Sequence, residues 1–213
     1  MNGAALLFAT TNEGKQREIR RLLEGLPLRL LFLQDVPAVP EVEETGETFL
    51  DNARLKAQGY AGLAPGAFAA AEDSGLVVPA LGGEPGVFSA RYGGLTDDVS
   101  RNALLLKRME SLYGKDRDAY YEAVVVLLSP QGEEHIFTGR VHGSIAPAPD
   151  GTGGFGYDPV FIHPDLGRTF GNASQYEKDL LSHRGKAIRA MREYLEGHLR
   201  VEGLLLLTEN SGS

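Results

Sequence analysis

The sequence predicts an α/β fold in which a mixed β-sheet is flanked by helices, and two patterns carry this prediction. Short apolar or β-branched runs alternate along the chain with segments whose apolar residues recur at helical spacing, which is typical of α/β proteins. The runs at 120–128 and 135–141 are separated by the turn residues Pro130, Gln131 and Gly132, which indicates a hairpin. A hairpin is antiparallel, so the sheet is expected to be mixed.

Each predicted element has a local signal. Apolar runs bounded by turn residues predict strands. We expect strands at 4–9, 29–33, 66–71, 76–78, 120–128, 135–141 and 160–162. Apolar residues at helical spacing, started by capping residues or stopped by proline, predict helices. We expect helices from about 15 to 26 and at 49–60, 99–112 and 184–195, with Val99 on the apolar face of the third.

The segments between these elements are expected to be irregular. Prolines exclude regular helix from 35–44, and the glycine content makes 81–96 and 151–159 loops. Residues 208–213 have the composition of a disordered end. No linker or repeat divides the chain, so we expect one compact domain at 1–200 followed by a C-terminal tail, 201–213.

The composition limits the partners and the chemistry. The formal charge of −8 argues against a nucleic-acid partner but is compatible with a small phosphorylated ligand. The chain has no cysteine, which excludes disulfides, thiolate zinc sites and thiol nucleophiles. The apolar start lacks a basic residue, and no apolar run is long enough to span a bilayer. We therefore expect a cytoplasmic protein without a membrane partner.

A polar segment between the first strand and the first helix is the first candidate site. It consists of Thr10, Thr11, Asn12, Glu13, Gly14 and Lys15. Backbone N–H groups and the positive end of a helix can receive a phosphate there, and Lys15 would add positive charge. The spacing is not that of a P-loop. Taken alone, the segment is more often an ordinary turn with a solvated lysine.

Two acidic segments are candidates for magnesium binding. Glu43 and Glu44 precede a helix, where the helix dipole also favours acidic residues. Alternate residues of an extended chain face opposite sides, so only one of the two is expected to reach a metal. Asp73 follows an apolar strand and precedes Ser74, a place where α/β proteins put functional carboxylates, although an Asx turn fits equally well. Asp73 would ligate magnesium or accept a proton from water.

Two later segments carry aromatic and basic side chains. In the second glycine-rich loop, Phe155 and Tyr157 offer flat faces for a planar base, and the glycines let the backbone approach a ligand. Lys178, His183 and Arg184 lie before or at the front of the last helix. Cations are unfavourable at a helix N-terminus, so these residues predict an anionic or hydrogen-bonding ligand.

The chain resembles the inosine triphosphate pyrophosphatase family in five ordered segments: TNEGK, EETGETFLDNARLKA, EDSGLVVPALGGEPGVFSARYGG, GTGGFGYDPVF and SHRGKA. The resemblance implies two lobes with a central substrate cleft, a homodimer, magnesium dependence, and hydrolysis of noncanonical purine nucleoside triphosphates. ITP, dITP and XTP would each yield the monophosphate and pyrophosphate. Thr11 stands where many bacterial members have glycine, and Glu72 where many have aspartate. The tail beyond Leu199 lies outside the resemblance.

The same resemblance implies a role for each candidate residue. The triphosphate would be held by Thr10, Thr11, Asn12, Glu13, Gly14 and Lys15, with Lys56 as a further phosphate contact. Glu43 or Glu44 would hold magnesium together with Asp73, which is also the family's proton acceptor. Ser74 would contact the substrate. The base would be cradled by Phe155, Gly156, Tyr157 and Asp158 and read by Lys178, His183 and Arg184.

Two other functions are compatible with the sequence. One is a pyrophosphatase of the septum-inhibitor type acting on modified pyrimidine nucleotides, which the SHRGKA and GGFGYDP segments disfavour. The other is a nucleotide-binding regulator without turnover, which the retained acidic residues disfavour. Discrimination against adenine is expected to rest on the 6-keto group, because donors left unpaired by adenine would reject it. The exclusion of guanine has no sequence signal.

Overall fold

The computed structural model describes residues 4–37 and 39–201 of this chain. Within this part, seven strands form one sheet in the order β2-β1-β3-β4-β5-β6-β7. β1 pairs parallel with β2 and with β3, whereas β6 pairs antiparallel with β5 and with β7. The predicted α/β fold with a mixed sheet is therefore confirmed.

The elements follow the predicted order with shifted ends. The strands are β1 (Ala4–Phe8), β2 (Leu28–Phe32), β3 (Phe68–Val77), β4 (Asp118–Leu128), β5 (Glu134–Ile145), β6 (Phe161–His163) and β7 (Arg168–Thr169). The helices are α1 (Glu13–Leu22), α2 (Phe49–Ala61), α3 (Asp98–Arg108), α4 (Gln175–Leu181) and α5 (His183–Val201). The side chains of Asn12 and Thr48 cap α1 and α2, respectively.

Three predictions about these elements were wrong. The strand expected at 66–71 does not end before the acidic residues, because β3 runs unbroken from Phe68 to Val77. The loop expected at 81–96 contains the 3-10 segment Gly86–Gly94. Val99 is 79% exposed, because the face of α3 that turns inward carries other residues. These buried residues are Arg101, Asn102 and Leu105.

Helix α4 has no counterpart among the predicted elements. It spans only seven residues, too few for a clear helical period. Its start is nevertheless marked by a capping box, in which Ser174 and Glu177 each accept a hydrogen bond from the other's backbone N–H. The expected tail at 201–213, including the end at 208–213, lies outside the described residues except for the last residue of α5.

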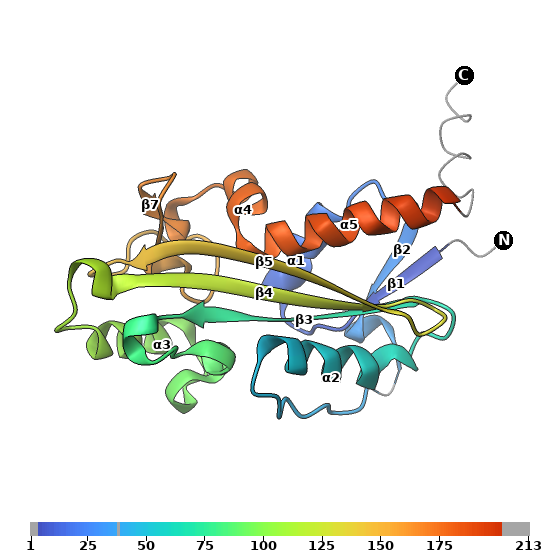
Figure 1. The fold of residues 1–213 in the computed structure, drawn as a ribbon, viewed down its shortest axis with the longest axis horizontal. Coiled ribbons are helices and arrows are strands. Elements are labelled where there is room, and N and C mark those ends of the chain that lie inside the picture. The colour runs from blue at the N-terminus through green and yellow to red at the C-terminus, as the bar shows by residue number, and fades with distance from the viewer. Residues whose placement is uncertain (1–3, 38, 202–213) are drawn as a thin grey trace, which may run out of the picture. The chain divides into compact units, whose positions relative to one another are not determined.

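The chain divides into two compact units, and it passes from one to the other within β3, β4 and β5 and again near the start of α5. Unit 1 comprises the described residues up to Asp73, Val124–Thr138 and those from Ala187 onward. Its α2 and α5 lie on opposite sides of β3 and β4 (Figure 1). The core on the α2 side is formed by Leu7, Ala53, Ala57, Ala71 and Val126, with further residues around them.

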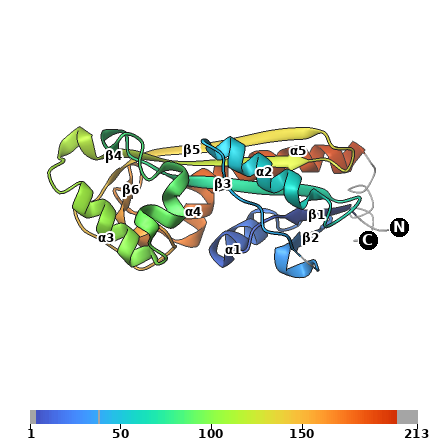
Figure 2. The same cartoon turned by 90° about the horizontal axis from the view of Figure 1, so that it is seen from below.

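Unit 2 comprises Ser74–Ala123 and Gly139–Lys186. Helix α3 covers one side of β4 and β5 in this unit (Figure 2). Its Leu105, and Met109 directly after it, are fully buried in a core with Tyr121, Ile145 and Phe161. The aromatic rings of Tyr121 and Phe161 lie 4.8 Å apart, at a spacing typical of favourable ring pairs.

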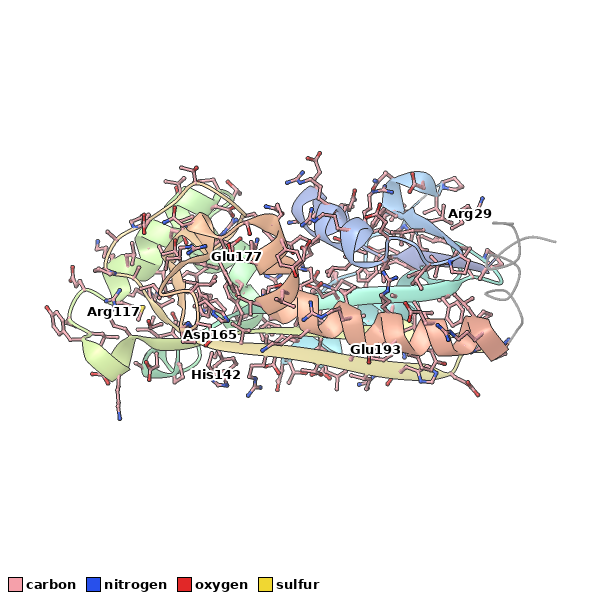
Figure 3. The ribbon with its side chains drawn as sticks, turned by 90° about the horizontal axis from the view of Figure 1, so that it is seen from above. Arg29, Arg117, His142, Asp165, Glu177 and Glu193 are labelled. Atoms are coloured by element: carbon pink, nitrogen blue, oxygen red, sulfur yellow. The ribbon has the colours of Figure 1, made fainter. Side chains whose placement is uncertain are left out.

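Arg117, labelled in Figure 3, fixes the chain after α3 to the end of β5 within unit 2. Its guanidinium donates to the carbonyl oxygens of Ile145 and Ala146, each at 2.7 Å. It also donates to the carbonyls of Met109 at 3.0 Å and Leu112 at 3.2 Å. One cation thus satisfies four acceptors, which holds α3 firmly in place. In the part of the chain that the structure describes, no helix is long and apolar enough to cross a membrane.

Candidate active site

The candidate site begins with the side-chain alternation of β3 in unit 1. Successive residues of a strand face opposite sides of the sheet, so Glu72 and Asp73 point in opposite directions. Asp73 faces α2, as does Ala71, which belongs to the core on that side. Glu72 faces the other way, where it meets Lys15 of α1. Both carboxylates are buried, with 3% and 6% of their surfaces exposed.

Asp73 is the centre of a group that we call the carboxylate–lysine cluster: Glu44, Asn52, Lys56 and Asp73. The Lys56 Nζ lies 3.0 Å from Asp73 Oδ1 and 3.1 Å from Glu44 Oε1. Asn52 and Lys56 are four residues apart on one face of α2, and the Asn52 amide donates to Asp73 Oδ2 at 3.4 Å. One lysine therefore joins two carboxylates that come from different parts of the chain.

Burial and charge act in opposite directions in this cluster. Burial raises the pKa of Asp73 above its usual range, although the positive charges of Lys56 and Lys15 oppose the increase. Burial also disfavours the charged form of Lys56, but the negative charges of Asp73 and Glu44 outweigh it and raise its pKa. Lys56 therefore stays protonated, and Asp73 is a more basic carboxylate than an exposed aspartate.

Lys15 and the polar segment before it form a cap and an ion pair. The Lys15 Nζ lies 3.3 Å from Glu72 Oε1. The side chain of Asn12 accepts a hydrogen bond of 2.9 Å from the Lys15 backbone N–H, as an N-cap residue does. Thr11, Asn12 and Glu13 are exposed, and Gly14 is buried, at the beginning of α1. The ordinary turn considered from the sequence is thus present, and it also brings Lys15 to Glu72.

The two glutamates that the sequence left as alternatives for metal binding differ in burial and in contacts. Glu44 is partly buried and reaches the cluster through Lys56, whereas Glu43 is exposed. This difference follows the alternation of an extended chain. No group of three acidic or histidine side chains placed to hold a metal occurs among the described residues. The carboxylate oxygens of Glu44 and Asp73 nevertheless fit magnesium, which takes one or two carboxylates and completes its shell with water and phosphate.

Unit 2 contains the second group of candidate residues, which we call the aromatic–cation set: Phe155, Asp158, Lys178 and Arg184. The Lys178 Nζ lies 5.1 Å and the Arg184 Cζ 5.3 Å from the centre of the Phe155 ring. Both distances are typical of cation–π contacts. Arg184 also donates to Ser74 Oγ at 3.2 Å. Three segments therefore meet here: the glycine-rich loop, the segment around Lys178 and the start of α5. The sequence predicted a ligand-binding role for each segment but did not predict their contact.

Asp158 links the loop to Lys178 through a buried ion pair. The Lys178 Nζ lies 2.7 Å from Asp158 Oδ2, and their side chains are 4% and 7% exposed. The same oxygen accepts a hydrogen bond of 2.9 Å from the Phe155 backbone N–H. Removing either charge would leave the other buried, which is costly. Asp158 is therefore a structural support of the loop as well as a candidate base contact.

The glycines of this loop are required by close packing. A Cβ on Gly154 would lie 2.0 Å from the Asp158 carboxylate, and one on Gly151 would lie 2.3 Å from the backbone of Gly171. Both glycines also have positive φ angles, which other residues rarely adopt. The Gly153 N–H donates to the Gly171 carbonyl at 2.8 Å. The loop therefore packs closely against the Asp158 side chain and the backbone around Gly171.

His183 and Tyr157 are both buried in unit 2. The ring of His183 stacks on Tyr121, with centroids 4.4 Å apart and planes 3° from parallel. The Tyr157 hydroxyl donates to the Ser89 carbonyl oxygen at 2.9 Å. Burial raises the pKa of both tyrosine hydroxyls, so both stay protonated. Tyr157 is therefore held within the protein, and Phe155 is the partly buried aromatic residue of the loop.

Sequence reasoning missed several members of these groups. Asn52 has a signal in retrospect, since it is a polar residue four positions before Lys56 on a helix face. Glu72 stands in the EDSG segment, but its pairing with Lys15 has no local signal. Tyr121 lies in an apolar strand and reads as an ordinary core residue.

The mixed sheet flanked by helices defines an α/β protein, with a buried carboxylate–lysine cluster in unit 1 and a closely packed glycine–aromatic loop in unit 2. The chain belongs to the Ham1 family, whose model matches residues 6–194. This result confirms the family resemblance seen in the sequence segments.

Curated relatives and solved structures agree with this assignment. The chain is 50% identical over 198 residues to a dITP/XTP pyrophosphatase of Thermus thermophilus, covering 92% of this chain and 95% of that protein. It is 47% identical over 191 residues to the dITP/XTP pyrophosphatase of Geobacter sulfurreducens, covering 89% and 96%. The HAM1 protein from Coxiella burnetii superposes with a TM-score of 0.82 at 36% identity, covering 91% and 99%.

Proposed function

We propose that this protein hydrolyses noncanonical purine nucleoside triphosphates, ITP, dITP and XTP, to the monophosphate and pyrophosphate. The observation that carries the proposal is Asp73, a buried carboxylate with a raised pKa beside Lys56 and Glu44, in a chain of the Ham1 family. Relatives about half identical to it carry the name dITP/XTP pyrophosphatase. A basic carboxylate next to cations suits the transfer of a phosphoryl group to water.

In this proposal, the residues of unit 1 take the triphosphate and perform the reaction. Asp73 accepts a proton from a water molecule whose oxygen forms a bond to the α-phosphorus. The bond from that phosphorus to the bridging oxygen breaks, and pyrophosphate leaves. Lys15 and Lys56 balance the charge of the phosphates, with the backbone of Thr10, Thr11, Asn12, Glu13 and Gly14 as further contacts. Positioning and charge neutralisation supply most of the rate increase in such reactions.

We propose magnesium as the metal, held by Asp73 and Glu44, with Glu43 exposed and outside this pair. Bound magnesium supplies positive charge that neutralises the phosphate oxygens. Lys56 holds the two carboxylates together through its ion pairs at 3.0 and 3.1 Å. Its protonated amine would also be available to a phosphate oxygen, since an anionic ligand competes for the same donor.

The residues of unit 2 take the base. Phe155 stacks on the planar purine, with Gly156, Tyr157 and Asp158 shaping the loop around it. Lys178, His183 and Arg184 recognise the 6-keto oxygen by donating hydrogen bonds. An adenine amino group at that position would leave these buried donors unpaired, and this loss rejects ATP. Ser74, which already accepts a hydrogen bond from Arg184, is a further substrate contact.

The test is pyrophosphate release from a panel of nucleotides with purified protein. ITP, dITP and XTP are expected to react with a kcat/KM at least about 100-fold above that for ATP, because a missing hydrogen bond at a buried donor costs about that factor or more. Chelation of magnesium should stop the reaction, and added magnesium should restore it. Similar kcat/KM values for ITP, ATP and GTP would contradict the proposed substrate class.

Two rivals are decided by the same panel. Preferred hydrolysis of modified pyrimidine nucleotides would indicate the septum-inhibitor type, and tight ITP binding without pyrophosphate would indicate a regulator. We also propose that the chain forms a homodimer, on the basis of the family to which it belongs. Sedimentation of the purified protein would show twice the mass of one chain.

A further inference from the structure

Helix α3 contributes two side chains that hold the glycine-rich loop at one residue. The Asp98 carboxylate accepts a hydrogen bond of 2.7 Å from the Gly156 backbone N–H. The Asn102 amide donates to the Gly156 carbonyl oxygen at 3.0 Å. Asp98 and Asn102 are four residues apart, so they share one face of the helix. All of these groups belong to unit 2.

These two hydrogen bonds hold the peptide groups on both sides of Gly156 in place. The N–H belongs to the peptide bond from Phe155, and the carbonyl belongs to the peptide bond to Tyr157. Fixing both peptide planes fixes the direction in which the chain leaves Phe155. Gly156 has a φ of +64° and open space where a Cβ would be, so its backbone conformation alone requires glycine. A flexible residue in such a conformation needs external partners to stay in one place.

The surroundings of the two side chains suit a rigid support. Arg101 pairs with Asp98 and donates to the Leu95 carbonyl at 3.1 Å, which fixes the carboxylate. Asn102 is 4% exposed, and its Oδ1 has no hydrogen-bond partner among the described residues. A buried acceptor without a partner is costly, so the hydrogen bond to Gly156 is what this amide contributes to stability at its position. Beyond the other end of α3, Arg117 joins the carbonyls of Met109 and Leu112 to those at the end of β5.

We propose that Asp98 and Asn102 are positioning residues for base recognition, which hold Gly156 so that the Phe155 ring stays ready to stack on the purine. This inference rests on the proposed function and adds α3 to the residues that determine specificity. Neither side chain touches the base. A preorganised ring saves the entropy of ordering the loop at the moment of binding, and that saving appears in the affinity for the nucleotide.

The experiment compares Asp98→Ala and Asn102→Ala with a matched control on the same helix. The control is Asp97→Ala, which removes the N-cap of α3, a hydrogen bond of 2.8 Å to the Ser100 N–H, and leaves Gly156 untouched. Steady-state kinetics with ITP give KM and kcat for each variant. Inorganic tripolyphosphate, which has no base, serves as a competitive probe of the phosphate contacts.

The two variants are expected to raise KM for ITP by about three- to tenfold, the range that one lost hydrogen bond gives, with a smaller change in kcat. The inhibition constant of tripolyphosphate should stay within about twofold of wild type, since the loop does not hold the phosphates. Asp98→Asn keeps an oxygen acceptor and should restore KM. Equal weakening of ITP and tripolyphosphate, or a KM for ITP no higher than that of Asp97→Ala, would overturn the inference.

Two further measurements also test the positioning role. Asn102→Asp keeps the size of the side chain but turns an acceptor toward the Gly156 carbonyl, so it should raise KM for ITP more than Asn102→Ala does. If wild type released no pyrophosphate from ITP, the proposed reaction would fail. Calorimetric Kd values for ITP in wild type, Asp98→Ala and Asp97→Ala would still test the positioning role: equal Kd values in the two variants would reject it.

Discussion

The carboxylate–lysine cluster of unit 1 and the aromatic–cation set of unit 2 are built on different physical grounds. In the first, Lys56 joins Asp73 and Glu44, and the groups are held by charge between side chains. In the second, one ring lies near two cations, and the loop that carries it is held by backbone hydrogen bonds and glycine contacts. Buried charges of this kind suit the proposed proton transfer and phosphate binding. A backbone held in one conformation suits the proposed recognition of a planar base.

This difference makes a general point about sites for a charged ligand with a planar part. In the proposed mechanism Asp73 takes up a proton, and burial raises its pKa although the positive charges of Lys56 and Lys15 oppose the increase. In the same proposal Phe155 stacks on the base, and its backbone is held by the hydrogen bond to Asp158 and by the close packing of the neighbouring glycines. Variants in the two regions should therefore change different kinetic constants.

The largest effect is expected from Asp73→Asn. The amide keeps the shape of the side chain but cannot accept a proton and is a weaker ligand for the proposed magnesium, so kcat for ITP should fall by about 1,000-fold. KM should change far less, because the base contacts remain. The measurement is pyrophosphate release with saturating ITP and magnesium. A kcat within about tenfold of wild type would remove Asp73 from its proposed role and erase the distinction between the two regions.

The next largest effect concerns stability in unit 2. Lys178→Met leaves the Asp158 carboxylate buried without its cation, which should lower the free energy of unfolding by about 3 kcal/mol. Denaturant titration of variant and wild type gives this difference. Arg54→Met, which breaks the more exposed pair with Glu134 at 2.8 Å, is the control and should leave stability almost unchanged. Equal losses of unfolding free energy in both variants would mean that the buried Asp158–Lys178 pair stabilises the protein no more than the more exposed pair does.

A smaller effect is expected from Phe155→Ala. Loss of base stacking should raise KM for ITP by about tenfold, with kcat changed less. Inhibition by tripolyphosphate should be retained. The same pair of measurements on Lys15→Met should give the opposite result, with weaker tripolyphosphate inhibition. A Phe155→Ala variant that loses both ligands equally would show that the loop serves the phosphates too.

The smallest effect is a contribution of His163 to the dependence of stability on pH. Burial holds the pKa of His163 below its usual value, so the folded state disfavours the protonated ring. As the pH falls below about 6.5, the unfolded state gains this proton first, and stability decreases until the folded pKa is passed. His163→Asn keeps an acceptor for the Asp165 N–H and lacks the titration.

Unfolding free energies at about pH 7.5 and about pH 5.5 check this prediction. The loss on acidification should be smaller in His163→Asn than in wild type. An identical loss in both would mean that His163 titrates in the folded protein as it does in the unfolded chain.

Several features of the site were determined by the sequence alone. The apolar helical pattern from residue 49 was enough to place the start of α2, because periodicity acts over a few residues, whereas the structure showed that Thr48 is its cap. The alternation of an extended chain was enough to require that only one of Glu43 and Glu44 enter the site. The ordered motifs were enough to identify the family, since their residue types and spacing are specific.

Only the tertiary structure decided which groups meet. Lys56 and Asp73 are 17 residues apart in the chain, and Asp98 lies 58 residues before the glycine that it holds. Their contacts depend on how α2 and α3 pack against distant strands, and no local pattern encodes that packing. The strand β3 continues through its acidic residues for the same reason, because partners on both faces of the sheet satisfy Glu72 and Asp73.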